Sequence, residues 1–427
     1  MRKQLFSVWS LLVVCIIITA SFLYIAKPVW EIAGDGHGYY IYARSLYFDG
    51  DLNFENEYER YDRIYGSDLV EGVRQSTGRH GNPFAIGKSI VLFGFFFIAV
   101  LVENFFGQFS PDMLGFSRYY EVSMALGSIF CTLLGVFFLY KSLQYFFSER
   151  ASWASTFVVL FASPLFHYIV YEPHMSHGVS FAGMAVLFFL CSKIYYEKHM
   201  TFGVSTTLGV IMGLVALVRW QNILFFVLPL SVLIWLWRKQ GVRFLYIISP
   251  FIISFLFFLP QLVVWKHLYG FWLGVPQGDT FIDVFHPKLF EVFFSPFHGL
   301  FIWHPLLLLG VLGLLISFRK NNIVSIPLLI GLLLQVYLNA SLIDWWGGSA
   351  FGARKMIGSL FIFGYGFSFL FDHVQKRKYS RYALMSIIIL SFAWNSLLML
   401  SAARGHLSMN DPVTYSQVFK APIQLLK

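Results

Sequence analysis

The chain has 427 residues, of which 57% are hydrophobic, 20% aromatic and only 12% charged. A soluble globular domain carries roughly 25% charged residues, so this composition excludes a soluble fold. The formal net charge of +9 is concentrated in short connectors between apolar runs, as the positive-inside rule expects of a membrane protein. It does not form the basic and aromatic stripe of a nucleic-acid binder, so no nucleic-acid partner is expected.

Twelve apolar segments follow one another along the chain, and their lengths suit helices in about 30 Å of hydrocarbon. The first, 5–26, follows a basic N-terminus, and we interpret it as a retained membrane helix rather than a cleaved signal peptide. We therefore expect one transmembrane domain over 1–427. The remaining segments are 84–102, 119–140, 153–171, 177–196, 203–218, 222–237, 244–264, 299–317, 323–340, 356–372 and 382–400.

The basic residues decide which connectors face the cytoplasm. If all twelve segments crossed the membrane from a cytoplasmic N-terminus, all three basic clusters would lie outside. Treating one segment before residue 238 as re-entrant or interfacial places all three clusters inside. The clusters are Arg238, Lys239 and Arg243; Arg319 and Lys320; and Lys376, Arg377, Lys378 and Arg381.

Segment 84–102 is the preferred exception, because it begins directly after Pro83, carries Lys88 one turn in and runs into Glu103. The alternative is that 203–237 forms a single broken span. The prediction is an all-α polytopic membrane protein with about eleven transmembrane helices, a cytoplasmic N-terminus and an outer C-terminus.

The large first outer loop, 27–83, holds ten of the 22 Asp and Glu residues, and the tail 401–427 is expected on the same side. Asp35 lies between two glycines, which allow a tight turn and leave its carboxylate uncrowded. A short amphipathic helix in the interface is predicted to hold Asp35 near the membrane surface. Its apolar face consists of Tyr39, Tyr42, Ala43, Leu46 and Tyr47.

A carboxylate at the bilayer edge is a candidate general base, although a solvated turn aspartate is the plainer reading of Asp35. The connector after the fourth span brings Glu172, His174 and His177 to the same face, where polar groups at a membrane boundary indicate function. Asp35, Glu172 and His174 could hold a divalent cation, but a lone His-x-x-His is a weak metal signal. A site for sugar or phosphate is favoured.

Two later motifs reach the same outer face. His298 lies in the connector before segment 299–317, and Asp344-Trp345 opens a glycine-rich stretch that ends at Arg354-Lys355. Glycines there free backbone N–H groups, and two cations near a helix start can hold an anionic group. Arg219, in a tight outer turn, is a further candidate for the same anion, while Trp345 could instead belong to an aromatic belt.

In this order the motifs resemble those of the GT-C superfamily of membrane glycosyltransferases, closest to bacterial relatives of protein O-mannosyltransferases and lipid A aminoarabinose transferases. The resemblance rests on Gly-Asp at Asp35, the Gly-Asn-Pro-Phe-Ala-Ile-Gly stretch before Lys88, the acid Glu172 and the segment ending at Arg354. It implies inverting transfer of a sugar from a polyprenyl-phosphate donor to a glycan, lipid or protein acceptor. The reaction would occur on the outer face of a bacterial plasma membrane.

The resemblance also implies roles for the residues. Asp35 would deprotonate the acceptor, Glu172 would orient the acceptor or a cation, and basic groups would hold the leaving lipid phosphate. Many family members have a second acid at the first motif, whereas here Gly36 and His37 follow, so His37 could take part of that role. The expected phosphate-binding residues are Arg354, Lys355, Arg219 and Lys88, and the expected substrate-binding residues are His37, Tyr39, His174, His177, His298, Asp344 and Trp345.

Two other functions remain open, a secondary transporter and a flippase for lipid-linked saccharides. Transporters place polar groups near the membrane midplane on broken helices. Here the candidate acids gather at one face and the span interiors are almost uncharged, which favours the transferase.

Overall fold

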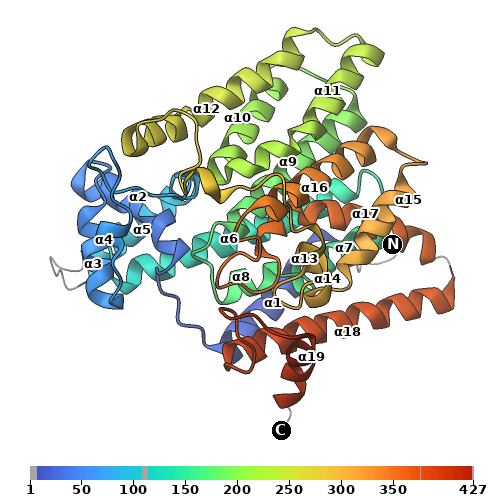
Figure 1. Ribbon diagram of the computed structural model, residues 1–427. Coiled ribbons are helices and arrows are strands. Elements are labelled where there is room, and N and C mark those ends of the chain that lie inside the picture. Colours follow the sequence, from blue (N-terminus) through green and yellow to red (C-terminus); the bar gives the residue numbers. More distant parts are fainter. Residues whose placement is uncertain (1–6, 108–113, 376, 426–427) are drawn as a thin grey trace.

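In the computed structural model, which describes residues 7–107, 114–375 and 377–425, the apolar segments form helices, and no strand occurs within these ranges (Figure 1). The first half contains α1 (Val8–Ala26), α2 (Asp35–Arg44), α3 (Glu55–Tyr65), α4 (Leu69–Gly72), α5 (Gly87–Phe106), α6 (Arg118–Leu143), α7 (Glu149–Phe161), α8 (Leu165–Val170), α9 (His177–Glu197) and α10 (Phe202–Val218). The second half contains α11 (Val227–Gln240), α12 (Leu245–Tyr269), α13 (Leu289–Phe294), α14 (Leu300–Trp303), α15 (Leu307–Ser317), α16 (Asn322–Ser341), α17 (Leu360–Val374), α18 (Lys378–Ala403) and α19 (Tyr415–Gln424).

Nine helical segments of the described chain are long and apolar enough to cross a membrane, and α10 and α15 are shorter apolar helices. The predicted segment 153–171 is divided into α7 and α8 by a break at Ser163-Pro164. Short turns of other helix types precede two further spans: η3 (Trp220–Phe226) leads into α11, and η5 (Arg354–Ser359) leads into α17. The chain is an integral membrane protein of the polytopic all-α class.

Helix α5 is long and apolar enough to cross a membrane, and it packs against α2, α6 and α10. At its start, Gly87 packs against the backbone of Leu217 near the end of α10. At its end, the carbonyl of Phe106 accepts a hydrogen bond of 3.4 Å from Tyr119 at the start of α6.

Helices α6 and α9 run parallel, because Gly178 packs on Thr132 and Gly135 packs on Ala182. Helix α10 returns in the opposite direction, so its end lies beside the start of α9, where Asn222 donates to Ser180 at 3.0 Å. The nine long and two shorter apolar helices agree with the prediction of about eleven spans. Which segment before residue 238 does not cross stays a prediction. Helices α10 and α11 are separate antiparallel segments, so the alternative of one broken span over 203–237 is wrong.

The basic clusters lie together at the opposite face, which we call the basic face. Lys320 Nζ lies 3.0 Å from His373 Nε2, which joins the ends of α15 and α17. The Tyr195 hydroxyl donates to Asn321 at 3.3 Å, and the Tyr195 ring lies 4.8 Å from Trp235 on α11, just before the Arg238 cluster. The face that carries α2 to α5 is the loop face, drawn in blue at one end of the bundle in Figure 1. Lys376 lies outside the described residues.

The loop helix differs from its prediction. It begins at Asp35 instead of near Tyr39, and all residues from Gly36 to Ser45 are buried rather than only one face. The reason is that α3 and α5 cover it. Arg44 pairs with Asp49 and, at 2.9 Å, with the buried carboxylate of Glu57 on α3.

Prolines inside α12 and α16 leave backbone carbonyls without their helical donor, and serines on neighbouring helices supply one. Pro250 frees the carbonyl of Tyr246, which accepts from Ser205 at 3.3 Å. Pro327 frees the carbonyl of Ile323, which accepts from Ser231 at 3.2 Å. In hydrocarbon such groups must be satisfied within the protein, so these bonds fix α10 to α12 and α11 to α16.

Helices α15 and α17 pack backbone to backbone through glycines. A Cβ added at Gly366 would overlap the carbonyl oxygen of Gly310, and one added at Gly313 would overlap that of Gly366. Small residues allow this close approach, which is a common basis of helix packing in membranes.

We predict that Gly366→Ala destabilises the protein by about 1–3 kcal/mol, the usual cost of overpacking, because both backbones must separate. Gly94→Ala on α5 is the control, since a Cβ there meets nothing within 4 Å. Thermal unfolding of the detergent-purified proteins measures the difference. Equal midpoints for the two variants would contradict backbone contact between α15 and α17.

Candidate functional site

Asp35 is the first residue of α2, and the local sequence fixes its position. Gly34 has φ +54° and ψ −137°, a conformation that side-chain-bearing residues rarely adopt. Gly36 packs against His174, whose Cβ would lie 2.7 Å from an added Cβ. A carboxylate in the first turn also benefits from the helix dipole. The two glycines therefore serve different purposes: one makes the turn and the other brings the 172–176 connector close.

Arg354 meets Asp35 from the opposite end of the sequence. Its Nη2 lies 2.8 Å from Asp35 Oδ2, and the side chains of Arg354 and Asp35 are 10% and 32% exposed. Arg354 Nη1 also contacts the sulfur of Met175 at 3.7 Å. The guanidinium is thus nearly enclosed, while the carboxylate that it orients remains accessible.

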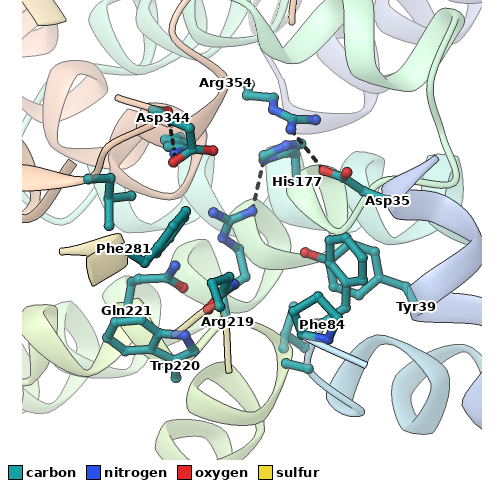
Figure 2. Close-up of a pocket in the computed structure, with 16 residues that line it drawn as sticks. Asp35, Tyr39, Phe84, His177, Arg219, Trp220, Gln221, Phe281, Asp344 and Arg354 are labelled. Atoms are coloured by element: carbon teal, nitrogen blue, oxygen red, sulfur yellow. Dashed lines mark hydrogen bonds and ion pairs between the residues drawn. The ribbon is translucent and has the colours of Figure 1, made fainter. Parts of the chain in front are cut away.

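The pair borders a cavity of about 240 Å³ at the loop face. Figure 2 shows Asp35 and Asp344 on opposite sides, with Arg219 between them and Trp220, Phe84 and Phe281 around the remaining wall. The polar side chains that line it are Asp35, Tyr39, His177, Arg219, Gln221, Gln277, Asp344, Arg354 and Lys355. Burial raises the pKa of Tyr39, so its hydroxyl remains protonated and can donate a hydrogen bond.

Three cations and two carboxylates line this cavity among the described residues. Lys355 Nζ lies 2.6 Å from Asp344 Oδ1, so these two charges form a second pair beside that of Asp35 and Arg354. Arg219 Nη1 instead contacts Ser176 Oγ at 3.2 Å and His177 Nδ1 at 3.3 Å, neither of which is an acid. The cavity therefore has a positive excess, because no carboxylate in the described part of the chain pairs with Arg219.

Two predicted residues support the site from outside the cavity. Glu172 lies 3.5 Å from His167, and its charge acts on Arg354 from that position. Lys88 is only 2% exposed, and its ammonium donates to the backbone carbonyls of His174 and Pro173. The prediction that Lys88 contacts the phosphate is therefore wrong. Lys88 instead holds the connector that carries Glu172, through hydrogen bonds to its backbone.

Three predicted histidines are also placed elsewhere. His37 points into a separate pocket of about 50 Å³, 4.7 Å from the ring of Tyr61, and burial lowers its pKa to about 3. It is neutral and cannot supply the second acid that the sequence suggested. Burial also lowers the pKa of His174 well below its ordinary value and that of His298 to about 3.

His298 contacts the tail of the chain rather than the cavity. Its Nε2 lies 3.2 Å from the carbonyl of Met409, and it shares a small pocket with Trp345 and Lys355. The carbonyl of Met409 also accepts a 3.3 Å hydrogen bond from the backbone N–H of Ala350. His298 and Trp345 therefore lie behind the wall that Lys355 presents to the cavity.

The metal alternative is not supported. Within the described residues, no group of three or more His, Cys, Asp or Glu side chains could hold a metal ion. Asp35 is paired with Arg354, Glu172 lies 3.5 Å from His167, and His174 is buried behind Gly36. The expected set of Asp35, Glu172 and His174 is thus divided among three different environments.

Several wall residues had no clear signal in the sequence. Trp220 and Gln221 follow Arg219 in the same turn and could have been found from that position. Phe281 and Gln277 come from the connector between α12 and α13. This connector bends over the cavity because two backbone hydrogen bonds tie it to the end of α16: Asp283 donates to Ser341 at 2.7 Å, and Ile343 donates to Phe281 at 3.0 Å. Such a long-range backbone contact has no local sequence pattern.

No protein-family model and no curated protein sequence matches the chain. Two solved structures resemble it in fold. The apo oligosaccharyltransferase of Archaeoglobus fulgidus has a TM-score of 0.53 and 12% identity, over 99% of this chain and 55% of that one. Apo ArnT from Cupriavidus metallidurans has a TM-score of 0.52 and 13% identity, over 96% of this chain and 68% of that one.

At these identities the similarity shows the fold alone: the chain shares the polytopic helical fold of these two proteins, which agrees with the fold that the sequence resemblance implied. It spans only about 55% of the length of the archaeal oligosaccharyltransferase.

Proposed function

We propose that this protein is a glycosyltransferase of the GT-C type that takes a sugar from a polyprenyl-phosphate donor. One observation carries the proposal: the same cavity is lined by an accessible carboxylate, Asp35, and by a cation, Arg219, that no acid of the described residues neutralises. Asp35 is 32% exposed, and among the described residues the Arg219 guanidinium has polar contacts to Ser176 and His177, neither of which is an acid. Glycosyl transfer needs a base for the acceptor and positive charge for the leaving phosphate, and the GT-C fold agrees with this chemistry.

In the proposed reaction, an acceptor hydroxyl gives its proton to Asp35 as its oxygen bonds to the anomeric carbon. The bond from that carbon to the phosphate oxygen breaks on the opposite side, so the configuration inverts. Arg219 stabilises the negative charge of the departing lipid phosphate. Arg354 orients Asp35 at 2.8 Å, and Lys355 is held by Asp344 at the far side of the cavity.

The remaining predicted residues take supporting roles in this proposal. Tyr39 and His177 line the cavity and are proposed to hydrogen-bond the sugar. Glu172 is proposed to act through Arg354, because it lies outside the cavity lining but within reach of the charge on Arg354. The acceptor is proposed to be a glycan, lipid or protein.

The proposed location is a bacterial plasma membrane with the loop face outside. The basic face carries the Arg238 and Arg319 clusters at the ends of α11 and α15, and clusters of this kind favour the cytoplasm. This orientation puts the Asp35 cavity on the outer side, where lipid-linked sugars would reach it together with their acceptors.

We predict that Arg219→Ala weakens binding of polyprenyl phosphate by at least about tenfold, because a hydrogen bond to a charged group contributes roughly 1.5–3 kcal/mol. Arg219→Lys should lose less, since it keeps the charge but not the planar fork. The measurement is the rise in unfolding temperature with added polyprenyl phosphate.

Two controls belong to this experiment. Arg63→Ala removes an exposed cation from the same loop face without touching the cavity, and uncharged polyprenol tests whether the phosphate is needed. If Arg219→Ala binds polyprenyl phosphate as well as Arg63→Ala does, Arg219 is not the phosphate site.

We predict that Asp35→Asn lowers sugar transfer about a hundredfold or more, because the amide cannot accept a proton from the acceptor. Affinity for polyprenyl phosphate should be kept or raised, since the change leaves Arg354 without its carboxylate partner. The assay incubates the purified protein with its source membranes, which supply lipid-linked sugars and acceptors, and measures the polyprenyl phosphate that is released. Glu55→Gln, an exposed acid of the same loop, should retain activity, and near-normal turnover in Asp35→Asn would remove the proposed base.

We predict that a cysteine at position 59 reacts with a membrane-impermeant maleimide in intact cells, whereas one at 239 reacts only after permeabilisation. Both positions are exposed, at the loop face and the basic face respectively. Labelling of position 239 in intact cells would reverse the proposed orientation.

A further inference from the structure

A second cavity lies at the basic-face half of the bundle, away from Asp35. It is a groove of about 560 Å³ between α11 and α16, and its walls are almost entirely apolar. Leu230, Ile326 and Ile330 on these walls are 41–44% exposed, so the groove opens to the surroundings of the protein. Arg238 and Lys239, both exposed, line its end at the basic face.

The floor of the groove is fixed by the bond that compensates Pro327. The Ser231 hydroxyl donates to the Ile323 carbonyl at 3.2 Å, and Ser231, Ile323 and Pro327 all line the groove. This bond uses the hydroxyl of Ser231, so the length of the groove presents hydrocarbon to an occupant. The groove is therefore a built feature of two tied helices rather than a gap between loose ones.

The groove has the length of one membrane leaflet. It extends along α11 from Val227 to Lys239, which is about 18 Å at 1.5 Å per helical residue. Half of a bilayer's hydrocarbon core is about 15 Å. The apolar walls thus cover the depth of an acyl chain, and the two cations lie where a headgroup would be.

We propose that this groove binds an anionic glycerophospholipid of the leaflet at the basic face. One acyl chain would lie along α11 and α16, and the headgroup phosphate would contact Arg238 and Lys239. Charge complementarity supports this occupant, because basic residues at the membrane surface attract anionic lipids. A partner helix fits less well, since helix interfaces in membranes favour small residues and this wall is built from Leu, Ile and Trp.

The site is independent of the proposed transfer reaction. It would nevertheless stabilise the cavity, because η3 precedes α11 and carries Trp220 and Gln221, while Leu342 and Asp344 follow α16. A lipid that holds α11 against α16 would therefore hold two walls of the Asp35 cavity together.

The test compares wild type with the double variant Arg238→Ala/Lys239→Ala in full-length protein. Arg319→Ala/Lys320→Ala is the matched control, since it removes the same charge from the same face but does not line the groove. Ile326→Trp is a second variant that fills the groove without changing charge. Each delipidated protein receives phosphatidylglycerol or, separately, phosphatidylcholine, and bound lipid is counted by native mass spectrometry alongside the unfolding temperature.

The expected result is that phosphatidylglycerol binds to and stabilises wild type and the Arg319→Ala/Lys320→Ala control. The double variant should bind it about tenfold or more weakly, and Ile326→Trp should fail to retain it. The proposal is overturned if phosphatidylcholine binds wild type as well as phosphatidylglycerol does, or if Ile326→Trp retains the lipid. It is also overturned if wild type is a dimer that Ile326→Trp dissociates, because the groove would then be an interface between two copies of the chain.

Discussion

The ion pair between Asp35 and Arg354 is the contact on which the site depends. It joins α2, at the loop face, to the turn before α17 through a contact of 2.8 Å between two residues that are far apart in the sequence. A nearly enclosed guanidinium is costly without a carboxylate, so the pair holds α2 against the later motif. Gly34 and Gly36 make this approach possible, one through its positive φ and the other through contact with His174. The cavity is the space left beside this junction.

Much of the fold could be predicted because a membrane restricts a chain to a few solutions. The length of the apolar runs predicted most of the helices that are long enough to cross, whereas the choice of 84–102 as the segment that does not cross stays a prediction. The same topology explains why Asp35, Arg219, Asp344, Arg354 and Lys355 meet in one cavity. Each lies just before or after a span, so knowing the number of crossings is enough to put all of them at one face.

The rest depended on contacts that leave no local pattern. Lys88 was expected at a phosphate, but its ammonium binds the backbone carbonyl of His174, and a backbone partner cannot be recognised from side-chain chemistry. His37 follows Asp35 by two residues, yet the helix turns it toward Tyr61. Burial rather than sequence decides that it is neutral. Phe281 reaches the cavity only because its connector pairs with the end of α16.

The charge balance of the cavity limits what it can bind. With Asp35 paired to Arg354 and Asp344 paired to Lys355, the remaining charge is that of Arg219. A neutral sugar alone would leave this charge unused in an enclosed site, where unpaired charges are unfavourable. An anionic phosphate that carries a sugar would use both the cation and the hydrogen-bonding wall. If Arg219 also had a carboxylate partner, the cavity would be neutral and would have no electrostatic preference for phosphate. The distribution of partners, rather than the number of cations, is therefore what favours a phosphate-linked donor.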